Sequence, residues 1–126
     1  MLSQAQLREL SPLALAYLGD AVYELFIRGH YLFPPKRTQT YHQQVVSQVR
    51  AEQQAHHLEA LRPHLTPDEV EVLRRGRNAT PSRRQRAAAA IYQQATSLET
   101  LVGYLYLTDP QRLGELLNHL DLEGTG

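Results

Sequence analysis

The chain has 126 residues, a formal net charge of zero, 42% apolar residues and no cysteine. This length suffices for one compact core and is too short for two, so we expect a single domain over 1–126, with a core over about 10–120 and a flexible tail over 121–126. The absence of cysteine excludes a disulfide framework and a thiolate metal site. The sequence shows neither a secretory signal nor an uninterrupted membrane-spanning stretch, so we expect a cytoplasmic protein without a membrane partner.

The first half of the chain predicts two long helices. Ser11 followed by Pro12 is typical of an N-cap and a first helical position, and this pair predicts a helix to about Leu32. The segment "FPPKR" then predicts a break. A loose apolar stripe predicts a second helix from about Thr40 to about Leu61, because proline follows shortly afterwards.

A capping signal opens the second half. Thr66 and Glu69 match the T-x-x-E capping box, which predicts a short helix that ends near Gly76. The segment "NATPSRRQR", residues 78–86, predicts a loop.

Two further helices complete the prediction. One follows the loop and ends near Leu107, and Asp109 with Pro110 begins a last one that extends to about Leu120. No segment has the alternating pattern of a strand. The sequence therefore predicts an all-α fold.

The stretch "LALAYLGDAV" contains Gly19 and Asp20 within an otherwise apolar helix. Asp20 shares a helical face with Glu24 and Arg28, so a solvated stripe is the simpler interpretation of the carboxylate. That interpretation leaves Gly19 unexplained, since glycine in a helix costs about 1 kcal/mol relative to alanine. A glycine here would permit close approach of another helix, as at a packed or symmetric contact.

A second apolar stretch, "ATSLETLVGYLYL", carries Glu99, with Gly103 four residues later. Thr96 and Glu99 also match a capping box, which would make Glu99 structural. Alternatively, each apolar helix supplies one carboxylate to a divalent-cation site. Carboxylates that bind Mg²⁺ beside phosphate-binding arginines are typical of a metal-dependent phosphodiesterase.

Arginines are concentrated in one segment. No carboxylate lies between Glu71 and Glu99, and six of the thirteen basic residues fall in this interval. They are Arg74, Arg75, Arg77, Arg83, Arg84 and Arg86. The guanidinium fork suits contact with phosphate, although a like-charge block can also be a solvated loop.

Three segments resemble the ribonuclease III family. The segment "LALAYLGDAVYELFIR" resembles its signature, in which an L-G-D-A turn of helix supplies an active-site aspartate. The segment "ATSLETLVGYLYL" resembles its second motif, which supplies a glutamate. The segment "VLRRGRNA" is similar to a motif of the Mini-ribonuclease III branch, which has the catalytic domain and lacks the double-stranded-RNA-binding domain. The resemblance extends from about Leu10 to Leu107.

The resemblance implies a ribonuclease III catalytic fold in which Asp20 and Glu99 are catalytic residues and ligands of Mg²⁺, for which Mn²⁺ can substitute. Larger members of the family have two more carboxylates, at the positions of Ala16 and Thr96 in this chain. The small branch departs in a similar way. The number of metal ions is therefore left open.

The resemblance further implies a homodimer in which the signature helices meet, with Gly19 at the dimer interface. Such a dimer cuts both strands of double-stranded RNA and leaves 5′-phosphate and 3′-hydroxyl ends. Since A-form RNA is recognised mainly through its shape and backbone, arginines suffice to hold it. The expected RNA-binding residues are Arg74, Arg75, Arg77, Asn78, Arg83, Arg84 and Arg86.

The branch implies a substrate and partners. The expected substrate is the precursor of 23S ribosomal RNA in the bacterial cytoplasm, with relatives in plastids, and a ribosomal protein is an expected helper. Two other functions remain open. One is a catalytically idle RNA-binding or ribosome-associated module, and the other is a helical dimerisation adaptor.

Overall fold

The computed structural model describes residues 2–80 and 86–122, and for residues 86 and 87 it describes the backbone alone. Within these ranges every regular element is a helix, which confirms the all-α prediction. The elements are α1 (Gln4–Glu9), α2 (Pro12–Tyr31), α3 (Thr38–Val49), α4 (Ala51–Leu61), the 3₁₀ turn η1 (Arg62–His64), α5 (Pro67–Asn78), α6 (Arg86–Thr108) and α7 (Pro110–Leu117). None of these helices is long and apolar enough to cross a membrane.

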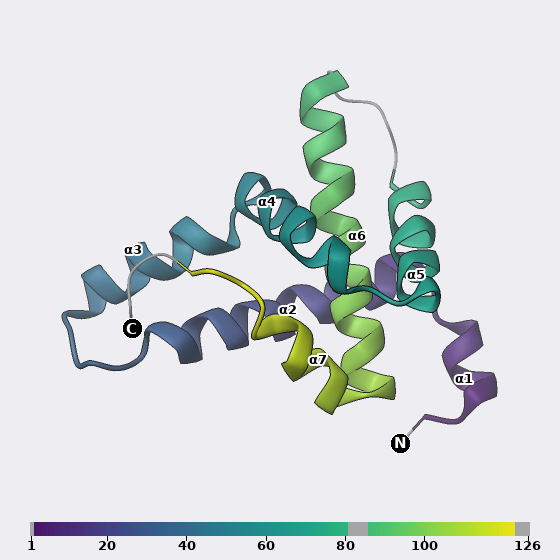
Figure 1. The fold of residues 1–126 in the computed structure, drawn as a ribbon, viewed down its shortest axis with the longest axis horizontal. Helices are drawn as coiled ribbons and strands as arrows, with labels where there is room; N and C mark the ends of the chain where they lie inside the picture. The colour runs from purple at the N-terminus through teal and green to yellow at the C-terminus, as the bar shows by residue number, and fades with distance from the viewer. Residues whose placement is uncertain (1, 81–85, 123–126) are drawn as a thin grey trace.

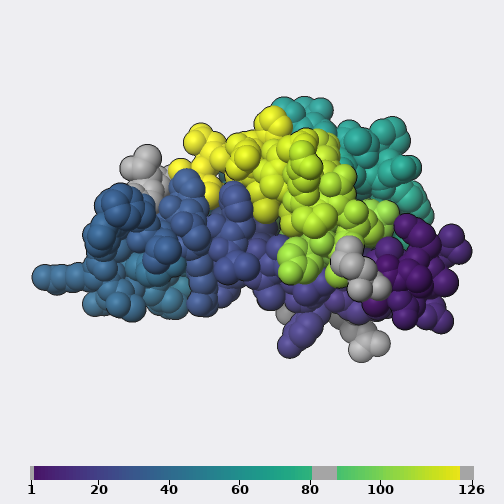
Figure 2. Space-filling view, turned by 90° about the horizontal axis from the view of Figure 1, so that it is seen from below, coloured from purple at the N-terminus to yellow at the C-terminus, as the bar shows by residue number. Residues whose placement is uncertain are grey.

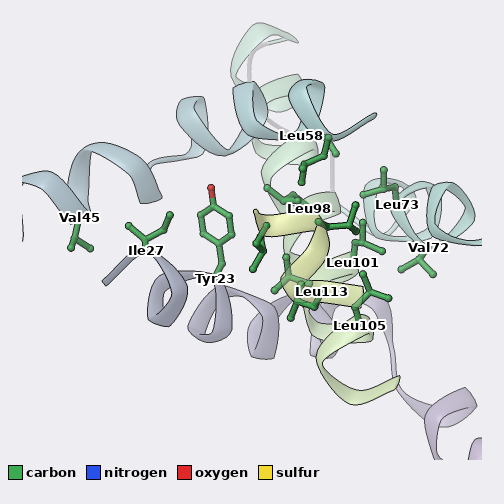
Figure 3. Close-up of a cluster of buried hydrophobic side chains, with 14 of the residues drawn as sticks. Tyr23, Ile27, Val45, Leu58, Val72, Leu73, Leu98, Leu101, Leu105 and Leu113 are labelled. Carbon is green, nitrogen blue, oxygen red and sulfur yellow. The ribbon is translucent and has the colours of Figure 1, made fainter. Parts of the chain in front are cut away.

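Helix α6 stands at the centre of the molecule and crosses α2 (Figure 1). Helices α4 and α5 pack against α6, whereas α3 extends along the far part of α2. The core lies where these helices meet, and α7 closes it (Figure 3). Its fully buried side chains include Tyr23, Ile27, Leu58, Leu98 and Leu101.

The predicted helix starts are confirmed. The Ser11 hydroxyl accepts a hydrogen bond from the amide of Ala14 at 3.1 Å and caps α2, with proline at the first helical position. Thr66 and Glu69 form the complete capping box of α5. The Asp109 side chain caps α7 by accepting a hydrogen bond from the amide of Arg112. Local capping chemistry therefore accounts for where these three helices begin.

The helix predicted over residues 40–61 is two helices, so this prediction is wrong. Arg50, with φ −66° and ψ 153°, ends α3 and begins α4. Neither glycine nor proline marks this break. It lets α3 lie along α2 while α4 turns to pack on α6, so tertiary packing overrides local helix propensity.

Smaller differences between the sequence prediction and the structure lie near the two ends of the chain. The short helix α1 is absent from the sequence prediction, and α7 ends at Leu117 rather than near Leu120. Leu122, within the segment predicted as a flexible tail, is partly buried against the core. Residues 123–126 and the loop residues 81–85 lie outside the described part of the chain.

Candidate active site

Two glycines allow α2 and α6 to touch backbone to backbone. A Cβ atom at Gly19 would overlap the carbonyl oxygen of Glu99 and lie 2.8 Å from the amide nitrogen of Gly103. A Cβ atom at Gly103 would in turn overlap the carbonyl group of Leu15. Any side chain at either position would push the helices apart. The crossing therefore brings Asp20, the residue after Gly19, beside Glu99.

The same geometry gives Gly19 a role within one protomer. Gly19 is buried, and the missing side chain faces α6 of its own chain. The close approach of α2 and α6 therefore accounts for this glycine, and its place at a dimer interface stays a prediction.

Asp20 and Glu99 form a carboxylate pair at the surface end of this crossing. Asp20 is exposed on α2, and Glu99 is half-buried on α6. Burial, with smaller contributions from hydrogen bonding to Asp20 and from the charge of Asp20, raises the pKa of Glu99 to about 8. The two predicted catalytic carboxylates are thus brought together from positions 79 residues apart in the sequence.

No cation balances this pair within the described ranges. None of the ion pairs formed by residues 2–80 and 86–122 includes Asp20 or Glu99. Two neighbouring carboxylates that lack a cationic side chain favour a shared proton or a bound cation. Carboxylate oxygens are the ligands that Mg²⁺ takes in proteins, so the pair fits a divalent ion.

The pair would leave most of a metal's ligand positions to other groups. The described part of the chain holds no cluster of three or more His, Cys, Asp or Glu side chains that could bind a metal. Ala16 and Thr96, where larger family members have carboxylates, are 6% and 5% exposed. Water and substrate oxygens would therefore complete the shell of an ion at Asp20 and Glu99.

The capping interpretation of Glu99 is excluded. Thr96 lies in the interior of α6, which begins ten residues earlier at Arg86. The carbonyl oxygen of Thr96 accepts a hydrogen bond from the Thr100 hydroxyl at 2.8 Å, as in a continuous helix. Glu99 therefore has no helix start to cap.

The solvated-stripe interpretation of Asp20 is partly right. Asp20 is exposed, and its helical neighbours Glu24 and Arg28 form the expected ion pair. This interpretation does not anticipate that Glu99 of α6 lies alongside. The position of Asp20 at the crossing, rather than its exposure, makes it a candidate ligand.

Polar side chains that the sequence prediction missed lie behind Glu99. Tyr23 Oη and His57 Nδ1 form a buried hydrogen bond. Burial, with a smaller contribution from His56, lowers the pKa of His57 to about 4, so this ring is neutral near pH 7. Burial and the nearby charge of Glu99 both raise the pKa of Tyr23, so the phenol keeps its proton.

Gln54 is the third missed residue. It is 3% exposed, its Nε2 donates a hydrogen bond to the carbonyl oxygen of Val49 at 2.8 Å, and its side chain lowers the pKa of Glu99 against the larger effect of burial. A signal for it exists in the sequence, because Gln54 and His57 fall on the same face of α4 as Leu58 and Leu61. Polar residues within such an apolar face need buried partners.

The predicted RNA-binding residues lie on and after α5. Arg75, Arg77 and Asn78 are exposed, and Arg74 is ion-paired with Glu71. Arg83 and Arg84 lie outside the described residues, and Arg86 begins α6 with its side chain outside the description. A surface hollow is lined by Arg62, Arg77, Ala90, Gln93, Gln94 and Ser97.

The hollow and the carboxylate pair lie on different sides of α6. A Cβ atom at Gly76 of α5 would contact the side chain of Thr100 and the backbone of Ser97, whereas α2 contacts Glu99. Positions 97 and 99 of a helix point about 200° apart. The structure therefore brings Asp20 and Glu99 together but does not add the described arginines to their cluster.

Comparisons with known proteins identify the family of this chain. The Ribonuclease III domain model matches residues 13–110. The Mini-ribonuclease 3 of Synechocystis sp. is 58% identical over 115 residues, which cover 91% of this chain and 80% of that relative. The Mini-ribonuclease 3 of Clostridium tetani is 38% identical over 120 residues, with 91% and 79% covered.

A solved structure shares the fold. The crystal structure of a protein from Fusobacterium nucleatum matches with a TM-score of 0.79 and 28% identity, over 88% of this chain and 93% of that one. Residues 13–110, which the Ribonuclease III domain model matches, include α6, all of α2 except Pro12, and both carboxylates. The chain belongs to the ribonuclease III family, in its Mini-ribonuclease 3 group, and is an endoribonuclease.

Proposed function

We propose that this endoribonuclease cleaves double-stranded RNA with Mg²⁺ held by Asp20 and Glu99, and that Mn²⁺ can replace Mg²⁺. The observation that carries the proposal is the pair itself, two carboxylates from separate helices with no cationic side chain beside them in the described ranges. A divalent ion bound there would activate water and stabilise charge on a phosphate.

The chain's own residues divide the remaining work. Asp20 is exposed, so it can contact both an ion and a large substrate from the surface. Glu99 is half-buried and its backbone is fixed by the helix crossing, so its place on α6 beside α2 is set before substrate binds. Hydrolysis would leave 5′-phosphate and 3′-hydroxyl ends.

The exposed arginines support RNA as the substrate class. Arg75 and Arg77 present guanidinium groups on the surface of α5, and Arg62 adds a third beside the hollow. Such contacts neutralise phosphates without reading sequence. From its Mini-ribonuclease 3 relatives, we propose the 23S ribosomal RNA precursor of the bacterial cytoplasm as substrate, with a ribosomal protein as helper.

The exposed side of α2 supports a homodimer. It carries Leu13, Tyr17 and Leu25, which are 45%, 86% and 69% exposed. Figure 2 shows α2 at the surface between α3 and α1. Contiguous exposed apolar residues mark interaction sites, and a two-fold contact uses the same surface of both copies. Sedimentation velocity of Tyr17→Asp should show monomer where the wild type shows dimer.

Cleavage of an end-labelled RNA duplex tests the catalytic proposal. The wild type should cut in Mg²⁺ and not in chelator, while Asp20→Asn should bind the duplex in Ca²⁺ without cutting it in Mg²⁺. Binding without cleavage by the wild type would contradict the proposal and favour the idle RNA-binding module. A wild type that does not bind RNA at all would favour the dimerisation adaptor.

A further inference from the structure

A hollow between three helical elements has a basic and polar lining. Its residues come from η1 (Arg62), from the end of α5 (Arg77) and from one face of α6 (Ala90, Gln93, Gln94 and Ser97). This part of α6 stands between α4 and α5 (Figure 1). The hollow has a volume of about 170 Å³, roughly ten times or more the space that one water needs, so it is large enough for a phosphate group. None of its lining residues is acidic.

Ser97 places a buried hydroxyl at the wall of the hollow. This residue is 4% exposed, and its side chain forms no hydrogen bond with the residues that the structure describes. Buried polar groups in native proteins are nearly always hydrogen-bonded, so an unpaired hydroxyl at the wall of a hollow favours a ligand with the complementary group. A hydroxyl donates one hydrogen bond, which suits an acceptor such as a phosphate oxygen.

Two arginines supply positive charge to the same hollow. Arg77 forms no ion pair with a described residue, whereas Arg62 donates through Nε to Glu59 at 3.0 Å and uses only one of its N–H groups there. The backbone beside Arg77 is fixed, because a Cβ atom at Gly76 would lie 3.2 Å from the Cα atom of Ser97. Guanidinium groups bind phosphate through paired N–H donors. The hollow therefore combines positive charge with hydrogen-bond donors on a preformed wall.

We propose that this hollow is a phosphate-binding site, separate from the carboxylate pair, in which Arg62 and Arg77 neutralise the charge and Ser97 donates to a phosphate oxygen. Residues 97 and 99 point about 200° apart on α6, so a phosphate in the hollow contacts α6 on the side away from Glu99. The phosphate group belongs to the RNA backbone or to a small phosphorylated molecule, which present the same chemistry to the site. The proposal goes beyond the cleavage reaction, because this site needs neither a metal ion nor Asp20.

Calorimetric titration with inorganic phosphate, in chelator and at low salt, tests the proposal. The wild type should show saturable binding, and Arg77→Met should weaken it by about 10- to 100-fold, the usual cost of one hydrogen bond to a charged group. Arg75→Met is the matched control, because Arg75 is also an exposed arginine of α5 without an ion pair in the described ranges and does not line the hollow. It should bind phosphate nearly as tightly as the wild type.

Ser97→Ala separates a ligand contact from a structural role and serves as the second variant if Arg77→Met does not fold. Because the hydroxyl has no partner among the described residues, its removal should not lower the melting temperature of the phosphate-free protein. It should reduce the rise in melting temperature that phosphate produces in the wild type. A lower melting temperature without phosphate, together with an unchanged rise on adding phosphate, would overturn the assignment of Ser97.

Duplex RNA in Ca²⁺ distinguishes the two sources of the phosphate group. If the RNA backbone supplies it, the duplex should displace inorganic phosphate, and Arg77→Met should weaken duplex binding more than Arg75→Met. If a small phosphorylated molecule supplies it, phosphate and duplex should bind together, and the two variants should bind the duplex equally.

Three results would overturn the phosphate site and leave the proposed cleavage reaction standing. One is a wild type without saturable phosphate binding. Another is an equal loss of phosphate binding in Arg77→Met and Arg75→Met, because the effect would then come from net charge alone. The third is a loss of phosphate binding in Asp20→Asn, which would place the phosphate at the carboxylate pair.

Discussion

The pattern T-x-x-E occurs at Thr66–Glu69 and again at Thr96–Glu99, and the two copies have opposite environments. At the start of α5, Thr66 and Glu69 cap each other's backbone amides. Glu69 also accepts two hydrogen bonds from Arg112, each 2.9 Å long. Hydrogen bonding to Arg112 is the main reason that the pKa of Glu69 is lowered.

The second copy lies in the middle of α6. Glu99 has no free amide to cap, and burial together with the neighbouring Asp20 raises its pKa. The same four-residue pattern therefore gives a structural carboxylate at a helix start and a candidate metal ligand in a helix interior. A carboxylate that is already satisfied by an arginine has little capacity left for a metal ion.

Exchanging each glutamate for glutamine should give the largest contrast, in activity. Glu99→Gln should lower the cleavage rate in Mg²⁺ by more than about 100-fold, since even outer partners of metal ligands are worth about 10- to 100-fold. Glu69→Gln should retain the wild-type rate at a temperature where it is folded. Single-turnover cleavage of labelled duplex measures both. Equal activity of the two variants would refute the assignment of Glu99.

The helix crossing that places Glu99 should be intolerant of a single methyl group. Gly19→Ala should destabilise the fold by on the order of 3 kcal/mol, because the new Cβ meets backbone that cannot move aside. Gly29→Ala on the same helix is the control, since nothing lies within 4 Å of its Cβ position. It should stabilise the protein by about 0.4–1 kcal/mol. Urea unfolding measures both, and equal effects would contradict the close approach.

For the stability of the fold the order should be reversed, with Glu69→Gln costing more than Glu99→Gln. Glu69→Gln should cost about 1–3 kcal/mol, because it removes the charge from a bidentate contact between α5 and α7 and leaves Arg112 only the His64 carbonyl and the more distant Glu115. Glu99→Gln should cost nothing in chelator at pH 8, because it removes a charge next to Asp20. Thermal unfolding checks this, and a loss of stability in Glu99→Gln would indicate that its charge has a cationic partner after all.

The smallest predicted effects are those of pH on stability. Glu69 and Glu99 should make stability depend on pH in opposite directions. The raised pKa of Glu99 means that its contribution to stability is complete below its unfolded pKa and is lost as pH rises through about 8. The lowered pKa of Glu69 means that its contribution is complete above its unfolded pKa and is lost as pH falls.

Melting temperatures measured in chelator from pH 3 to pH 9 test these two opposite pH dependences of stability. Glu99→Gln should flatten the alkaline limb, and Glu69→Gln should flatten the acid limb. Mg²⁺ should restore stability on the alkaline side in the wild type and in Glu69→Gln, but not in Glu99→Gln. A wild-type profile that does not respond to Mg²⁺ at pH 8 would contradict binding at the carboxylate pair.

Much of the fold followed from local chemistry in the sequence. Ser11, Thr66 and Asp109 mark helix starts through their own side chains, so the starts of α2, α5 and α7 could be predicted. The break at Arg50 could not, because no residue there disfavours helix and the break depends on packing against α6. The same break gives Gln54 its fixed position, so that residue too escaped prediction.

From the sequence, Asp20 and Glu99 could be placed on apolar helices and, through the resemblance, predicted to belong to one site. That the glycines face each other's helices within one protomer follows from the packing, because a missing Cβ has no direction in a sequence. Packing also distinguishes the two T-x-x-E patterns. A capping box needs free amides at a helix start, and where a helix starts depends on the packing of the whole chain.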